Sequence, residues 1–203
     1  MSSSPVAVRD RPRNRGDSMP KAPVTKSWLA LLRGINVLGR NKVPMKALAG
    51  ALESAGFQSV RTYIQSGNVL FRSSSEDARA IASRIARLIE QNFDCKPAVL
   101  VIGRAELAAA VRANPFPGAS DNHKLLHLYF LAERPKSPDL DSLTRVDAGR
   151  EAVALKGGVL YLWTPDGFAD SVLRSRIERC LGVPATARNW RTANELLRLL
   201  SES

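Results

Sequence analysis

Polar and basic side chains gather in two loops of this sequence, and both loops interrupt runs of apolar residues. The first loop, residues 33–42, reads RGINVLGRNK and carries Arg33, Asn36 and Lys42. A loop that leads into a helix can bind an anion through such side chains, because the first N–H groups of the helix also point outward. The loop lacks the spacing of a P-loop or of a dinucleotide fingerprint. The alternative is that Arg33 and Asn36 bond to neighbouring backbone and fix the loop.

The second loop joins two predicted strands at residues 65–68, which read QSGN. Gly67 and Asn68 can adopt the positive φ that a tight turn requires, so turn formation alone can explain both residues. No turn type requires Gln65 or Ser66. These two side chains are therefore the stronger candidates for ligand contacts in this loop.

A third polar segment, RNWRT at residues 188–192, joins the last predicted strand to the last helix. Thr192 is expected to cap that helix, and Trp190 to pack near its start. Arg188 and Asn189 have no such role, and a planar guanidinium beside an amide and an indole could clamp a phosphate or stack on a base. An equally good alternative is a bidentate pair between Arg188 and a carboxylate that joins two halves of the fold.

No catalytic residue can be assigned from the sequence. Nucleophile, zinc-binding and paired-carboxylate patterns do not stand out. His123 and His127 have the spacing of a metal-binding pair on a helix, but HKLLHLYFL reads as a strand, so we expect no metal site and no cofactor. The candidate ligand-binding residues are Arg33, Asn36, Lys42, Gln65, Ser66, Asn68, Arg188, Asn189 and Trp190.

The apolar pattern predicts the elements that position these segments. Over residues 28–102 it gives the order strand, helix, strand, strand, helix, strand, which is that of a ferredoxin-like unit. A helix near 104–113 follows, and the same order then recurs. Within the second half we expect a helix from Ser171 to Leu181. Capping boxes are expected at residues 74–77 and 192–195.

The predicted class is therefore α+β, with two tandem ferredoxin-like (βαββαβ) halves, antiparallel sheets and a C-terminal helix. The predicted boundaries are a disordered basic tail over 1–27, a first half over 28–102, a linker helix and loop over 103–123, and a second half with the C-terminal helix over 124–203. Met19 is an alternative start to Met1. The tail has no apolar core of a secretory signal.

Charge and cysteine content limit the partners and the compartment. Residues 1–27 carry a net charge of +4 and the remainder +7, of a total of +11. Such a surface attracts phosphates or nucleic acid, although the arginines are scattered, as on an ordinary solvated surface. Cys95 and Cys180 form no metal spacing or disulfide framework and indicate buried thiols in a reducing cytoplasm. No apolar run approaches the roughly 18 residues that span a membrane, so we expect no membrane partner.

Four motifs carry a family resemblance. LLRGINVLGRNKVPM, TYIQSGNVLF, NPFP and TARNWRT, in this order and spacing, resemble the bacterial family called domain of unknown function 1697, over nearly all of residues 29–200. The resemblance implies an α+β fold with two ferredoxin-like halves, and no established reaction, cofactor or catalytic residue. One departure is Leu38, where the family usually has a glycine, which loosens any claim that the loop holds a ligand with bare backbone.

The leading functional hypothesis is a cytoplasmic protein that binds a phosphorylated or otherwise anionic small ligand, with a nucleotide as one candidate. The site would lie where the 33–42 loop, the 65–68 hairpin and residues 188–189 converge. Two alternatives stay open: nucleic-acid binding through the basic surface and tail, and an enzyme that acts on a phosphorylated metabolite. The sequence does not predict the oligomeric state.

Overall fold

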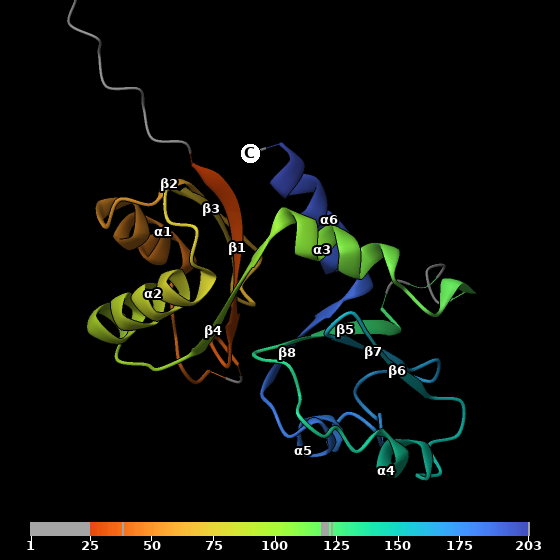
Figure 1. Ribbon diagram of the computed structural model, residues 1–203. Helices are drawn as coiled ribbons and strands as arrows, with labels where there is room; N and C mark the ends of the chain where they lie inside the picture. Colours follow the sequence, from red (N-terminus) through yellow and green to blue (C-terminus); the bar gives the residue numbers. More distant parts are fainter. Residues whose placement is uncertain (1–24, 38, 119–121, 123, 203) are drawn as a thin grey trace, which may run out of the picture.

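The computed structural model describes residues 25–37, 39–118, 122 and 124–202 (Figure 1). The predicted tail up to residue 24, with Met19, lies outside the described residues, as do Leu38 and His123. The first strand begins at Lys26, two residues before the predicted start of the fold, so the last part of the predicted tail is wrong.

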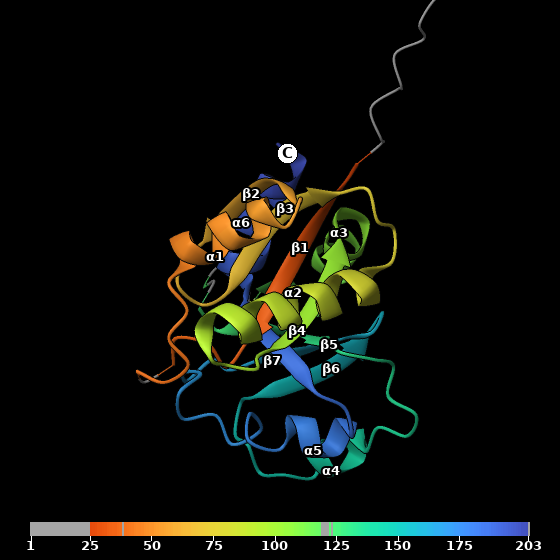
Figure 2. The same ribbon diagram turned by 90° about the vertical axis from the view of Figure 1, so that its left-hand side faces the viewer.

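The first half has the predicted element order. Its elements are β1 (Lys26–Arg33), α1 (Met45–Ser54), β2 (Gln58–Tyr63), β3 (Asn68–Ser73), α2 (Ala78–Phe93) and β4 (Ala98–Gly103). All neighbouring strands are antiparallel, and the order in the sheet is β2-β3-β1-β4. Both helices cover the same face of this sheet, as Figure 2 shows with α1 and α2 in front of the strands.

The second half repeats the arrangement after a connecting helix. Its elements are α3 (Arg104–Arg112), β5 (Leu126–Leu131), α4 (Leu140–Thr144), β6 (Ala152–Lys156), β7 (Val159–Trp163), α5 (Ile177–Leu181), β8 (Ala185–Asn189) and α6 (Trp190–Ser201). The sheet order β6-β7-β5-β8, again antiparallel, is equivalent to that of the first sheet. The predicted α+β class with two ferredoxin-like halves and a C-terminal helix is confirmed.

A central core joins the two halves. The sheet faces that carry no helix of their own half share this core with α3 and α6, and it includes Leu31, Leu128, Trp190 and Leu196 (Figure 1). The buried hydroxyl of Tyr161 donates to the carbonyl of Ala110, at 2.6 Å, and so ties the second sheet to α3. This packing brings the C-terminal end of β1 beside the edge strand β8.

The predicted helix from Ser171 to Leu181 is too long, because α5 begins only at Ile177. The side chain of Glu151 accepts hydrogen bonds from the hydroxyl of Ser171 and from the N–H groups of Val172 and Leu173. This distant carboxylate satisfies backbone donors that would otherwise favour a longer helix, and residues 172–176 form turns instead.

Both predicted capping boxes are wrong in position. The N-cap of α2 is Asp77, which accepts from the N–H groups of Arg79 and Ala80. The N-cap of α6 is Asn189, whose side chain accepts from the N–H of Thr192 at 2.8 Å. Each helix therefore uses a residue that can cap as well as a serine or threonine does.

The 65–68 hairpin turns as predicted at Gly67, where φ is +80°, but Asn68 does not have positive φ. Ile64, at φ +50°, is the second left-handed residue of this turn. A Cβ on Gly67 would lie 2.7 Å from the Cβ of Leu32, closer than a van der Waals contact. Gly67 is therefore required both by its dihedral angle and by the close approach of β1.

We expect Gly67→Ala to lower the free energy of unfolding by about 2–3 kcal/mol, because strain and overpacking add. Gly157→Ala is the matched control: its φ is +58°, and nothing lies within 4 Å of its added Cβ. That variant should lose only about 1 kcal/mol. Urea denaturation measures both, and equal losses would contradict the close-approach argument.

Candidate functional site

A groove of about 700 Å³ opens where the end of β1 meets β8 and α5. The loop after β1 and the 65–66 turn form one side, and residues 168–178 form the other. Five of the nine candidate residues line this groove, and they come from all three polar segments. They are Arg33, Asn36, Gln65, Ser66 and Arg188.

The other four candidates lie elsewhere. Lys42 is exposed and does not line the groove. Asn68 is fully buried beneath the hairpin, and Asn189 is used as the cap of α6. Trp190 packs in the central core. Asn68, Asn189 and Trp190 therefore have structural roles. The sequence analysis allowed such a role for Asn68 and Trp190 but not for Asn189.

Asn36 fixes the first loop, as the backbone-bonding alternative proposed. It adopts φ +53°, and its side-chain amide donates to the carbonyls of Val43 and Gln65, both at 3.0 Å. Its side-chain oxygen accepts from the N–H of Val43 at 2.8 Å. All of the polar atoms of this side chain are used, so Asn36 holds the loop against the 65–68 hairpin.

Arg33 makes an ion pair across the groove. Its guanidinium donates to the Oε2 of Glu178 on α5 at 2.7 Å. The Oε1 of the same carboxylate accepts from the N–H of Ala185. Glu178 therefore neutralises Arg33 and also caps part of the free edge of β8.

Arg188 reaches from β8 into the first half. Its Nε donates to the side-chain oxygen of Asn68, and its Nη2 donates to the carbonyls of Leu32, Ser66 and Gly67 at 3.0–3.2 Å. The alternative of a carboxylate partner is wrong, because these acceptors are an amide and backbone carbonyls. The side chain of Arg188 thus acts as a strut, by which we mean a buried side chain that links the two halves through hydrogen bonds. Asn68 is buried because its side-chain oxygen is one of the acceptors in this link.

The charge of Arg188 is buried without compensation. The residue is 8% exposed, and none of the ion pairs among the described residues includes it. Burial lowers the pKa of the guanidinium to about 10, so it stays protonated at neutral pH. Nη1 carries two N–H groups but makes one hydrogen bond within the described chain, to the carbonyl of Ala187. Arg188 lines the groove, and one N–H group of its Nη1 has no partner within the described chain.

Several groove residues were missed by the sequence analysis, Glu178 among them. The guanidinium of Arg174 lies 4.7 Å over the ring of Phe168 and makes no ion pair with a described residue. Tyr129 and Thr186 also line the groove. Burial raises the pKa of Tyr129 to about 12, so its hydroxyl is a donor at neutral pH. Thr186 could have been found, because it lies on the same face of β8 as Arg188.

Behind Phe168 lies a buried histidine. The rings of Phe168 and His127 are stacked, with centroids 3.6 Å apart and planes at 16°. Burial, with a smaller contribution from the charge of Arg174, lowers the pKa of His127 to about 4. The imidazole is therefore neutral at neutral pH and supports the wall of the groove.

The folded protein should lose stability as the pH falls from about 6.5 to about 4. Over this range the unfolded chain protonates His127 and the folded chain does not, so the unfolded state binds more protons. The full loss for this group is about 3 kcal/mol. His127→Leu should show a shallower fall than the wild type in urea denaturation between pH 7 and pH 4, and parallel curves would contradict the assignment.

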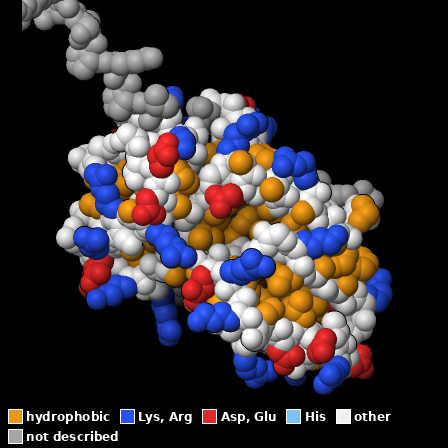
Figure 3. Space-filling view, viewed as in Figure 1, with side chains coloured by type: hydrophobic (Ala, Val, Ile, Leu, Met, Phe, Trp, Pro, Cys, Tyr) orange, Lys and Arg blue, Asp and Glu red, His pale blue; other side chains and the backbone are white. Residues whose placement is uncertain are grey.

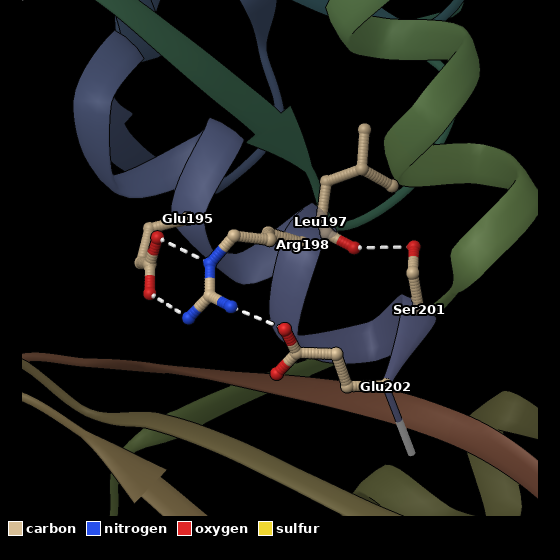
Figure 4. A network of polar contacts seen from close by, with 5 residues as sticks. All are labelled: Glu195, Leu197, Arg198, Ser201 and Glu202. Carbon is tan, nitrogen blue, oxygen red and sulfur yellow. Dashed lines mark hydrogen bonds and ion pairs between the residues drawn. The ribbon is translucent and has the colours of Figure 1, made fainter.

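Some arginines of the described surface are already paired with carboxylates. On α6, Arg198 bonds to the carboxylates of Glu195 and Glu202, while the hydroxyl of Ser201 donates to the carbonyl of Leu197 (Figure 4). This cluster borders a second surface hollow beside Trp190. With Arg198 paired, this hollow keeps one guanidinium without an ion pair to a described residue, that of Arg191, whereas the groove has two, those of Arg174 and Arg188.

Metal-binding clusters and membrane-spanning helices are absent from the described part of the chain. No group of three or more His, Cys, Asp or Glu side chains there could hold a metal ion. Among the helices that the structure describes, none has the length and apolar character needed to cross a membrane.

Comparison with known proteins agrees with the fold. A search of curated proteins finds no match. Among solved structures, the conserved bacterial protein SP0830 from Streptococcus pneumoniae superposes with a TM-score of 0.62 at 22% sequence identity, over 87% of this chain and 99% of that protein. A likeness at this identity concerns the fold alone. The family model "Protein of unknown function (DUF1697)" matches residues 25–161, two thirds of the sequence, and the chain therefore belongs to this family.

Proposed function

We propose that this protein binds a small phosphorylated or otherwise anionic ligand, such as a nucleotide, in the groove between β1, β8 and α5. The observation that carries the proposal is that two guanidinium groups without carboxylate partners in the described chain, those of Arg174 and Arg188, line the same groove. An anion between them would compensate a buried positive charge, and charge-assisted hydrogen bonds are the strong ones.

Neutral donors complete the proposed site. The amide of Gln65 and the hydroxyls of Thr186 and Tyr129 make no hydrogen bond with other described side chains or backbone, and all three residues line the groove. The Arg33–Glu178 pair adds no net charge and holds the two sides of the groove together. A phosphoryl group has several acceptor oxygens, and it therefore suits this set of donors better than an anion with a single acceptor atom does.

A binding role is better supported than the enzyme alternative. Among the described residues that line the groove, Glu178 is the single carboxylate, and both of its oxygens already accept hydrogen bonds. The site thus offers donors but lacks a free general base. We propose the same groove as the working surface of a cytoplasmic binding protein.

A thermal-shift screen of the full chain tests the proposal. The panel holds inorganic phosphate, nucleotides, sugar phosphates and short DNA and RNA oligonucleotides. One small phosphorylated class should raise the unfolding midpoint with concentration, because a ligand of the native state stabilises it by RT ln(1 + [L]/Kd). A shift with oligonucleotides alone that salt abolishes would favour nucleic-acid binding instead. No shift with any compound would contradict the proposal.

A further inference from the structure

The two sheets have four edge strands, and a free edge is a template for pairing with another chain. Two of these edges are protected. β2 has an irregular register between Gln58 and Arg61, with Ser59 at φ +50°, which interrupts the edge. On β8, the side chain of Glu178 accepts from an edge N–H and that of Arg188 donates to an edge carbonyl.

The edge of β4 is partly protected. The side chain of Glu106 accepts from the N–H of Gly103 at 2.8 Å. The adjoining residues Val101 and Ile102 are only 4% and 7% exposed, so the C-terminal part of this strand is covered by its own chain. A second chain could reach only the beginning of β4.

The edge of β6 has no such protection in the described structure. Its register with β7 is continuous from Ala152 to Lys156, without a bulge. The four residues Ala152–Leu155 are uncharged, contain no proline, and are all partly exposed. Figure 3 shows hydrophobic side chains gathered over β6 and β7 on the face seen in Figure 1.

The β6–β7 turn fixes which backbone groups are free. Gly157 and Gly158 both have positive φ, and they form a two-residue hairpin turn between Lys156 and Val159. Residues that flank such a turn bond to each other, so the alternation of the strand directs the N–H and C=O groups of Val153 and Leu155 away from β7. Two residues therefore present four unpaired backbone groups at this edge.

We propose that β6 pairs with β6 of a second copy of this chain, antiparallel, about a two-fold axis at Ala154. In this register Val153 faces Leu155 of the second copy, and Leu155 faces Val153 of the second copy. All four free N–H and C=O groups of the edge are then hydrogen-bonded. Ala154 faces Ala154 of the second copy, where small side chains permit close approach. Lys156 faces Ala152 of the second copy, so no like charges are opposed. The β6-β7-β5-β8 sheets of the two copies then form one continuous sheet.

The self-complementary register is what favours a second copy over a different partner. An isologous contact requires that one surface match itself, and this strand does so in hydrogen-bonding groups, side-chain size and charge. A single pair of short strands buries a small area, so the dimer is expected to be weak and concentration-dependent.

A disulfide trap at the axis tests the register. Residues opposite each other in a non-hydrogen-bonded antiparallel pair have Cα atoms about 4.5 Å apart, which is within the range of a disulfide. Ala154→Cys should therefore form a covalent dimer under mild oxidation, seen on a non-reducing gel. Ala152→Cys is the matched control on the same face. It should form no covalent dimer on the same gel, because residue 152 faces Lys156 of the second copy. The native cysteines, Cys95 and Cys180, are both buried.

Sedimentation of the full chain tests the association itself. The wild type should shift from monomer to dimer as its concentration rises. Val153→Pro should stay monomeric at the same concentrations while keeping its circular dichroism spectrum, because its N–H points away from β7 and no bond within the sheet is lost. A wild type that is monomeric throughout, or equal cross-linking of the two cysteine variants, would overturn the proposal.

Discussion

Arg188→Met lowers the free energy of unfolding by about 3 kcal/mol or more, the largest stability loss that we expect from any single polar substitution in this chain. Methionine keeps much of the length of the side chain but donates no hydrogen bond. The carbonyl of Leu32 and the side-chain oxygen of Asn68 then lose the donor that Arg188 supplies at the junction of the two halves, whereas the carbonyl of Gly67 keeps its bond from the N–H of Leu32. Each unsatisfied buried acceptor is costly, so the losses accumulate.

Two controls separate this effect from loss of charge. Arg188→Lys keeps the charge but not the planar set of donors, and it should recover only part of the lost stability. Arg87→Met removes an exposed arginine of α2 that has no partner among the described residues, and it should change stability by less than about 0.5 kcal/mol. Urea denaturation measures all three variants. A loss below about 1 kcal/mol for Arg188→Met would contradict the role of Arg188 as a strut.

Arg174→Ala should weaken the binding of the strongest phosphorylated compound in the thermal-shift panel by about 10–100-fold. This corresponds to the loss of one charge-assisted hydrogen bond, about 1.5–3 kcal/mol. Arg174 is exposed and rests on Phe168, so its removal should leave the unfolding midpoint of the free protein nearly unchanged. Isothermal titration gives the affinities of wild type and variant.

The matched control for this prediction is Arg87→Ala. It removes the same charge from α2, which covers the far face of the first sheet. Because Arg87 lies outside the groove lining, its loss should change affinity by less than about twofold, the size of a screened long-range effect. Equal losses of affinity in the two variants would indicate a general attraction to the basic surface rather than a site at the groove.

Local patterns in the sequence predicted the fold well. Strand and helix order follow from the apolar period and from turn residues such as Gly157 and Gly158, and each of these signals lies within a few residues of its effect. The predictions that were wrong depended on distant groups. The start of α5 is set by Glu151, which lies twenty residues before Ser171 in the sequence.

The candidate groove could be predicted only in part for the same reason. The three polar segments were recognisable from their composition, and they do line one groove. A link between the two halves through Arg188 was one of the alternatives, but its acceptors were not recognisable, because Gly67 is 121 residues away along the chain. Arg174 and Phe168 lie in a turn-rich segment without periodicity, and their place in the groove follows from how the two halves pack.

The most direct test of the central claim is a crystal soaked with tungstate, an anomalously scattering analogue of phosphate. The account predicts an anomalous peak in the groove, within hydrogen-bonding distance of the free Nη1 donor of Arg188 and of the guanidinium of Arg174. An empty groove, with tungstate bound only at other arginines of the surface, would contradict it.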